Sequence, residues 1–149
     1  MRVLGIITVI LAVATLSPAV ADDAPSYLAN GGMYVSDAEA CSASNAEEAA
    51  GLQLTAKGLF GYEFGCTFAS FLPVRLDDGD DEPDQHIAIA SCGDDSGITR
   101  PDMIVLVPNG EDSLIVTSQN DYAIMSVWEK DEPSNIKWMV QREFLRCPR

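Results

Sequence analysis

Four cysteines carry the clearest chemical potential in this chain: Cys41, Cys66, Cys92 and Cys147. A cysteine can act as a nucleophile, bind a metal or form a disulfide, and its surroundings decide which. None of the spacings is C-x-x-C and the chain has a single histidine, so neither a redox dithiol nor a mixed Cys/His zinc site is indicated. An even number of cysteines in an exported chain predicts two disulfides.

The residues around Cys66 favour a structural role for its sulfur. The run YEFGCTFASF (62–71) alternates with period two, so that Tyr62, Phe64, Cys66 and Phe68 share one face of an expected strand. Burial among aromatic rings raises the pKa of a thiol and makes it a poor nucleophile. We therefore expect Cys66 to form a disulfide in the core.

Four cysteines allow three pairings. We favour Cys66 with Cys92, because these residues lie on strands expected to be neighbours in a meander. The second pair is then Cys41 with Cys147, which would join the first and last elements of the domain.

The stretch CGDDSG (92–97) resembles the Gly-Asp-Ser-Gly sequence around the nucleophile of chymotrypsin-like serine proteases. An extra aspartate separates Gly93 from the Asp-Ser-Gly triplet, and the chain is too short for the two barrels of those enzymes. Nothing places His86 within hydrogen-bond reach of Ser96, as a catalytic base would have to be. We predict no catalytic residues and expect that the protein is not an enzyme.

The segment DDGDDEPD (77–84) holds six carboxylates in eight residues. Calcium prefers such oxygen ligands, but Gly79 and Pro83 do not stand where an EF-hand loop requires them. We favour a solvated hairpin loop whose charge discourages edge association, and leave a weak calcium site as the alternative. No metal site and no cofactor are predicted.

Aromatic residues offer a second kind of site. For Trp128 and Trp138, on two late expected strands, core packing is the first interpretation and stacking on a ligand the second. Glu63 lies on the face opposite Tyr62 and Phe64, and we interpret it as an ordinary outward carboxylate.

The first residues have the layout of a secretory signal peptide. Arg2 precedes the uncharged apolar run 3–16, and Pro18 and the small-x-small sequence 19–21 follow. The apolar run is shorter than the roughly 20 residues of a membrane span. We expect cleavage after residue 21, hence no membrane span in the mature protein and a periplasmic or secreted location.

The remaining chain predicts a flexible leader at 22–32 and a single disulfide-linked β domain at 33–149. Ser44 and Glu47 form a capping box, and Gly51 could end the helix they start, so one short N-terminal helix is expected within 36–51. Strands are expected at 52–56, 62–71, 86–92, 103–108, 113–118, 122–128 and 136–145, and 33–35 is a short strand candidate. About seven short strands separated by Gly-, Pro-, Asn- and Asp-rich turns predict a small antiparallel barrel or sandwich.

Charge narrows the range of partners. The formal net charge of −14 is unfavourable for binding nucleic acid or an anionic membrane surface. It favours either a free soluble protein or one with a cationic protein partner. The sequence does not predict the oligomeric state.

In size, export signal, cysteine count, acidity and expected strands, the chain resembles the small exported two-disulfide β-barrel proteins of bacteria, which include lysozyme and protease inhibitors. The membrane-bound lysozyme inhibitor family carries a Ser-Gly-x-x-Tyr loop, and the nearest string here is SGITR, with Arg100 in place of the tyrosine. The resemblance implies a binding role for Ser96, Gly97 and Arg100.

We therefore expect an exported non-enzymatic binding protein of the cell envelope, with inhibition of a cationic hydrolase such as lysozyme as the specific hypothesis. The alternative is a small-ligand carrier or small hydrolase that uses the barrel mouth, lined by Tyr62, Trp128 or Trp138. A purely structural envelope component is a third possibility that the sequence does not separate from the first.

Overall fold

A computed structural model describes residues 24–43, 51–76, 85–128 and 139–148. The predicted signal peptide, the acidic run 77–84 and Trp138 lie outside these ranges. The elements in chain order are η1 (Ala29–Gly31), β1 (Tyr34–Val35), η2 (Ala38–Ser42), β2 (Gln53–Thr55), β3 (Gly58–Gly61), β4 (Phe64–Val74), β5 (Gln85–Asp94), β6 (Thr99–Pro108), β7 (Ser113–Ser118), α1 (Gln119–Trp128) and β8 (Arg142–Arg146).

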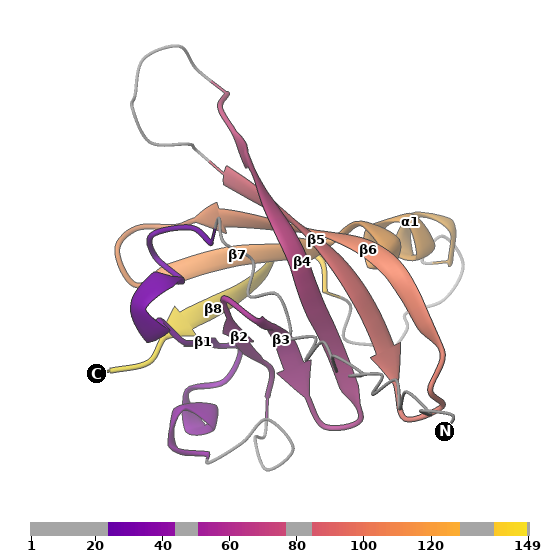
Figure 1. Ribbon diagram of the computed structural model, residues 1–149, viewed down its shortest axis with the longest axis horizontal. Helices are drawn as coiled ribbons and strands as arrows, with labels where there is room; N and C mark the ends of the chain where they lie inside the picture. The colour runs from indigo at the N-terminus through magenta and orange to yellow at the C-terminus, as the bar shows by residue number, and fades with distance from the viewer. Residues whose placement is uncertain (1–23, 44–50, 77–84, 129–138, 149) are drawn as a thin grey trace, which may run out of the picture.

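The strands form a closed antiparallel barrel in which each strand pairs with its neighbours in sequence and β8 pairs with β1 (Figure 1). The prediction of a mainly β, disulfide-linked fold is confirmed, and the structure selects the barrel over the sandwich. The described residues hold eight strands rather than about seven. Beyond the barrel, β4 and β5 continue as a protruding two-stranded ribbon (Figure 1).

Both predicted disulfides are present. Cys41 bonds to Cys147, and Cys66 bonds to Cys92, with which it is in direct register across β4 and β5. Disulfides of this kind are typical of proteins from oxidising compartments. Cys66 is fully buried, as the alternation of 62–71 predicted.

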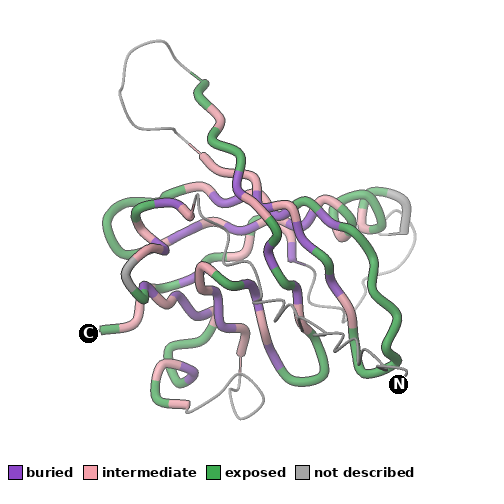
Figure 2. The backbone as a smooth tube through the Cα atoms, in the orientation of Figure 1, coloured by how far each residue is buried: buried purple, intermediate pink, exposed green. Residues whose placement is uncertain are grey.

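The core fills the barrel interior. Buried and exposed residues alternate along the strands (Figure 2), and the inward side chains form one continuous apolar cluster. Its members are Leu28, Tyr34, Leu54, Leu59, Cys66, Phe68, Phe71, Ala88, Ala90, Cys92, Ile104, Leu106, Leu114, Val116, Met139 and Phe144. Leu28, which we had assigned to the flexible leader, is only 1% exposed and so belongs to this core.

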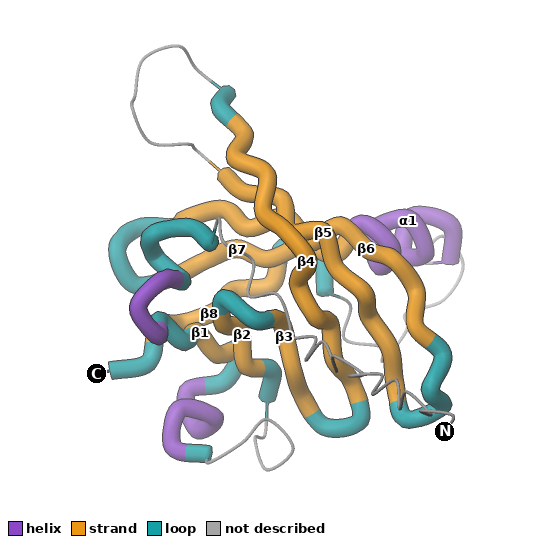
Figure 3. Tube along the Cα trace, viewed as in Figure 1, coloured by secondary structure: helices purple, strands orange, loops and turns teal. Residues whose placement is uncertain are grey.

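The position of the helix differs from the prediction. Residues 38–42 form only a short 3-10 helix, and Ser44 and Glu47 lie outside the described residues. The one α-helix among the described elements, α1, covers 122–128, which we had predicted to be a strand (Figure 3). Apolar residues at 122–128 suit either structure. Hydrogen bonds between the start of α1 and the distant residues Asp102 and Met139 favour the helix.

Strand β3 is not among the predicted strands, because Gly58 and Gly61 are more typical of a turn. The strand runs so close to β4 that a Cβ on Gly58 would lie 2.1 Å from the carbonyl oxygen of Cys66. Glycine here permits close approach of two strands rather than a change of direction. Among the described residues, no helix combines the length and apolar character needed to cross a bilayer.

Candidate functional site

The candidate site lies at the end of the barrel where the β3–β4 and β5–β6 turns meet, which we call the hairpin end. The disulfide partners Cys66 and Cys92 face each other across β4 and β5, so Gly65 faces Gly93 one step further and Phe64 faces Asp94 after that. The covalent bond thus sets the register that brings the two turns side by side.

The β5–β6 turn is held by its own hydrogen bonds. The Ser96 N–H donates to Asp94 Oδ1 at 2.9 Å, and the Gly97 N–H donates to the Asp94 carbonyl at 3.2 Å. Gly97 adopts a φ of 76°, which glycine tolerates better than other residues. Residues 94–101 are all exposed, so this turn projects from the hairpin end into solvent.

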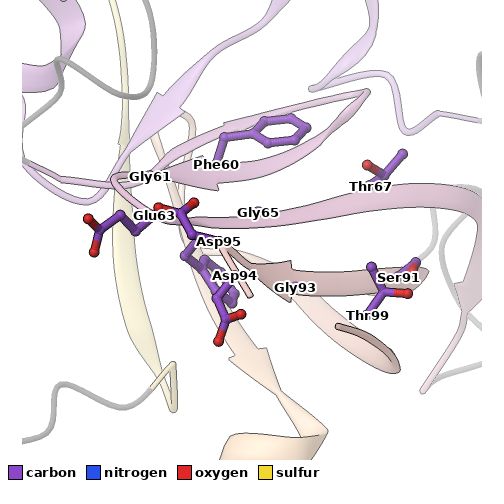
Figure 4. Close-up of a pocket in the computed structure, with 11 residues that line it drawn as sticks. Phe60, Gly61, Glu63, Gly65, Thr67, Ser91, Gly93, Asp94, Asp95 and Thr99 are labelled. Atoms are coloured by element: carbon purple, nitrogen blue, oxygen red, sulfur yellow. The ribbon is translucent and has the colours of Figure 1, made fainter. Parts of the chain in front are cut away.

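An open hollow of about 740 Å³, here called the outer hollow, lies on the outer face of β3, β4 and β5 (Figure 4). Gly65 and Gly93 leave its floor free of side chains, and the ring of Phe60 forms a wall, since a Cβ on Gly65 would lie 3.1 Å from that ring. Exposed hydroxyls of Thr67 and Ser91 lie beyond the glycines.

Three exposed carboxylates lie at the turn end of the outer hollow: Glu63, Asp94 and Asp95 (Figure 4). Hydrogen bonds from the Ser96 side chain and then its backbone N–H hold the pKa of Asp94 below its usual value. Asp94 is therefore ionised throughout the neutral range. A flat floor beside an aromatic ring and carboxylates suits a cationic group with an apolar stem.

A second hollow, of about 240 Å³, opens into the barrel between α1 and the β5–β6 turn, and we call it the mouth hollow. Leu59 and Ile104 form its fully buried floor. Around its opening, Phe64 is 39% exposed, Ile98 is 61% exposed and Ile124 is 39% exposed. The mouth hollow therefore has an apolar floor and apolar side chains at its opening, with polar residues such as Ser96, Arg100 and Asp102 also in its lining.

A buried carboxylate, Asp102, also lines the mouth hollow, but its oxygens are occupied. Oδ2 accepts from the Ser118 hydroxyl at 2.6 Å, and Oδ1 accepts from the backbone N–H groups of Met103 at 2.7 Å and Asn120 at 3.1 Å. Since Asn120 is in the first turn of α1, this arrangement caps the helix. We interpret Asp102 as structural rather than catalytic.

The structure brings together some of the predicted binding residues. Ser96 and Arg100 both line the mouth hollow, with Gly97 in the turn between them. Trp128 is the last residue of α1 instead of a strand residue, and the orientation of its side chain is not described. Tyr62 is 70% exposed in the β3–β4 turn and lines neither hollow.

His86 lies at the start of β5, while Ser96 follows its far end, so the two residues are at opposite ends of the barrel. The Tyr27 hydroxyl lies 3.1 Å from Nδ1 of His86. Within the described ranges, no three His, Cys, Asp or Glu residues are grouped to hold a metal ion.

The sequence interpretation did not identify the outer hollow. Glu63 is an ordinary outward residue in that interpretation, and Gly65 and Gly93 have no assigned role. The signal was nevertheless available: a Cys66–Cys92 bridge between antiparallel neighbours requires Gly65 to face Gly93 and places both adjacent turns together. The sequence did not indicate that the ring of Phe60 would form a wall of the outer hollow.

Comparisons with known proteins do not identify this one. The chain matches no family model, no curated protein and no solved structure.

Proposed function

We propose that the protein is an exported non-enzymatic binding protein of the cell envelope whose hairpin end binds a cationic protein, a basic hydrolase such as lysozyme being the specific candidate. The observation that carries this proposal is the outer hollow, where exposed Glu63, Asp94 and Asp95 stand beside an open floor of glycine and a Phe60 wall.

The charge of the whole chain supports the same partner. With a net charge of −14, the protein attracts basic proteins over several ångströms before contact. The carboxylates at the hairpin end then provide a local target. Because the Cys66–Cys92 disulfide and the Asp94 hydrogen bonds already order the two turns, binding there requires little additional ordering.

The packed interior gives less support to the alternative of a carrier that encloses its ligand. The inward side chains of the described strands fill the barrel, and the mouth hollow of about 240 Å³ is smaller than the roughly 300–1,000 Å³ typical of small-molecule sites. The occupied oxygens of Asp102 likewise give no support to a hydrolase at the mouth.

The first test is titration of the purified protein with lysozymes and basic secreted proteases by calorimetry, together with assays of their activity. We expect binding at about 20 mM salt that weakens steeply by about 500 mM, because salt screens attraction between exposed charges. The double variant Glu63→Gln/Asp95→Asn should bind about tenfold more weakly, because two carboxylates at the contact are neutralised.

A matched control variant separates the effect of charge at the hairpin end from the effect of the overall net charge. The double variant Glu39→Gln/Glu111→Gln loses the same charge from exposed positions outside both hollows, and should bind nearly as tightly as the natural protein. Equal losses in both double variants would remove the hairpin end as the site. No binding to any basic protein at low salt would contradict the proposed function itself.

A further inference from the structure

The mouth hollow has no role in the proposal above. It adjoins the outer hollow so closely that Phe64, Gly93 and Asp94 line both. An acidic surface and an apolar opening are thus parts of one continuous face at the hairpin end. A partner bound to the carboxylates is therefore close enough to reach the mouth hollow.

We infer that the mouth hollow receives one apolar side chain of the partner, so that the segment recognised is an apolar residue flanked by basic residues. This inference rests on the proposed function and specifies its partner. The basic residues lie on the outer hollow, and the apolar residue enters between Ile98 and Ile124.

The size of the mouth hollow supports a single side chain as the occupant. Its volume of about 240 Å³ is below the usual range for small-molecule pockets, which begins at roughly 300 Å³. Its floor of Leu59 and Ile104 is apolar and fully buried, and these two side chains offer no hydrogen bond to a water that lies against them. An apolar side chain that displaces this water gains affinity.

Three polar residues that line the mouth hollow, Asp102, Ser118 and Asp121, are hydrogen-bonded within the protein. Asp102 accepts three hydrogen bonds, Ser118 Oγ accepts from the Asp121 N–H at 3.0 Å, and Asp121 Oδ2 accepts from the Met139 N–H at 2.8 Å. These three residues are thus less available to a polar ligand than the exposed Asp94 and Arg100 at the opening. The part of the hollow against Leu59 and Ile104 therefore favours apolar contact.

Charge complementarity selects the flanking residues. Asp94 lines both hollows, with Asp95 and Glu63 close by on the outer one. Arg100 is the only cationic side chain among the described residues that line either hollow. A basic segment is consequently favoured over an acidic one of the same shape.

The experiment compares capped synthetic peptides by calorimetry at low salt. The first has a central leucine with two lysines on either side; in the second, serine replaces the leucine; in the third, glutamates replace the lysines. We expect the lysine–leucine peptide to bind about tenfold more tightly than the lysine–serine peptide, because a leucine side chain is transferred from water into a half-open apolar site. The glutamate–leucine peptide should not bind measurably.

Protein variants locate the contact. Ile98→Ser and Ile124→Ser should remove most of the difference between the leucine and serine peptides. Met103→Ser replaces an apolar residue that lines neither hollow and whose exposed fraction, 49%, lies between those of Ile124 and Ile98, and it should leave the difference unchanged. The comparison of peptides on the natural protein needs no variant, so the test does not depend on how well the variants fold.

The outcomes separate the two proposals. Equal affinity for the leucine and serine peptides, with binding that weakens in salt, would overturn the apolar anchor and leave the acidic binding surface. Equal affinity for the lysine–leucine and glutamate–leucine peptides would overturn the requirement for basic flanks. If neither lysine peptide bound at low salt, both proposals would be overturned.

Discussion

At the residue scale, His86 links the segment before β1 to the barrel. It is the only histidine of the chain, and its Nδ1 lies 3.1 Å from the Tyr27 hydroxyl, with the two rings edge to face at 5.5 Å. Desolvation by burial lowers the pKa of His86 from its usual 6.5. The same effect raises the pKa of Tyr27, so both groups are neutral around pH 7.

We predict that this histidine makes the fold less stable as the pH falls. Because the folded-state pKa is lowered, the unfolded chain binds a proton first, and stability is lost as the pH decreases through about 6.5. His86→Gln retains a polar group but does not titrate. Urea unfolding at about pH 7.5 and about pH 5.5 should show the natural protein losing stability relative to the variant.

Carboxylates also titrate in this range, so only the difference between the two proteins reports on His86. A difference in unfolding free energy that stays constant across this pH range would show that His86 has the same pKa folded and unfolded. The exposed variant Tyr62→Phe, which lies at the other end of the barrel from His86, serves as a control whose difference from the natural protein should not change with pH.

At the element scale, helix α1 depends on groups outside its own sequence. Ser118 precedes the helix and accepts from the Asp121 N–H, while Asp102 on β6 accepts from the Asn120 N–H. Both bonds satisfy donors that a helix leaves free in its first turn. The Met139 N–H, from the chain leading to β8, donates to Asp121 and ties that segment to the same helix start.

We predict that Asp102→Ala lowers the unfolding free energy by about 2–4 kcal/mol, since it removes the cap and leaves buried donors without acceptors. Asp102→Asn should lose less, because an amide oxygen can still accept. Urea unfolding followed by circular dichroism measures both. Asp95→Ala, at an exposed turn position, should change stability by less than about 0.5 kcal/mol. If Asp102→Ala also changed the unfolding free energy by less than about 0.5 kcal/mol, α1 would not need this cap.

At the scale of the whole molecule, the barrel is closed by its shortest strand. Strand β1 contributes only Tyr34 and Val35, which pair with β2 on one side and β8 on the other. The Cys147 N–H donates to the Met33 carbonyl at 2.9 Å, and the Cys41–Cys147 disulfide joins residues 106 apart in sequence at this seam. We interpret the Cys41–Cys147 disulfide as a reinforcement of the β1–β8 pairing, which contains only two residue pairs.

We predict that Cys41→Ala/Cys147→Ala costs about 2–4 kcal/mol of unfolding free energy, as expected for a bridge closing a long loop. Hydrogen exchange should accelerate first in β1 and β8, where the seam opens, and least in β5 and β6. Urea unfolding measures the loss of unfolding free energy, and hydrogen exchange followed by NMR shows which strands open. Uniform acceleration in all strands would mean that the disulfide stabilises the whole barrel rather than the seam.

The residue pattern by itself determined the disulfide-linked β fold. Alternating apolar residues predicted β4, β5 and β7, and the two cysteine pairings followed from where those strands would lie. Local patterns suffice here because side chains on a strand alternate between two faces regardless of what packs against them.

Only the tertiary structure decided the rest. It placed Leu28 in the core, converted the apolar run 122–128 from an expected strand to a helix capped by Asp102, and joined two turns and two glycines into the hairpin end. Each outcome depends on groups far apart in the sequence, such as Asp102 with Asn120 or Gly65 with Gly93. Short windows of sequence do not contain these contacts, because chain closure brings them together.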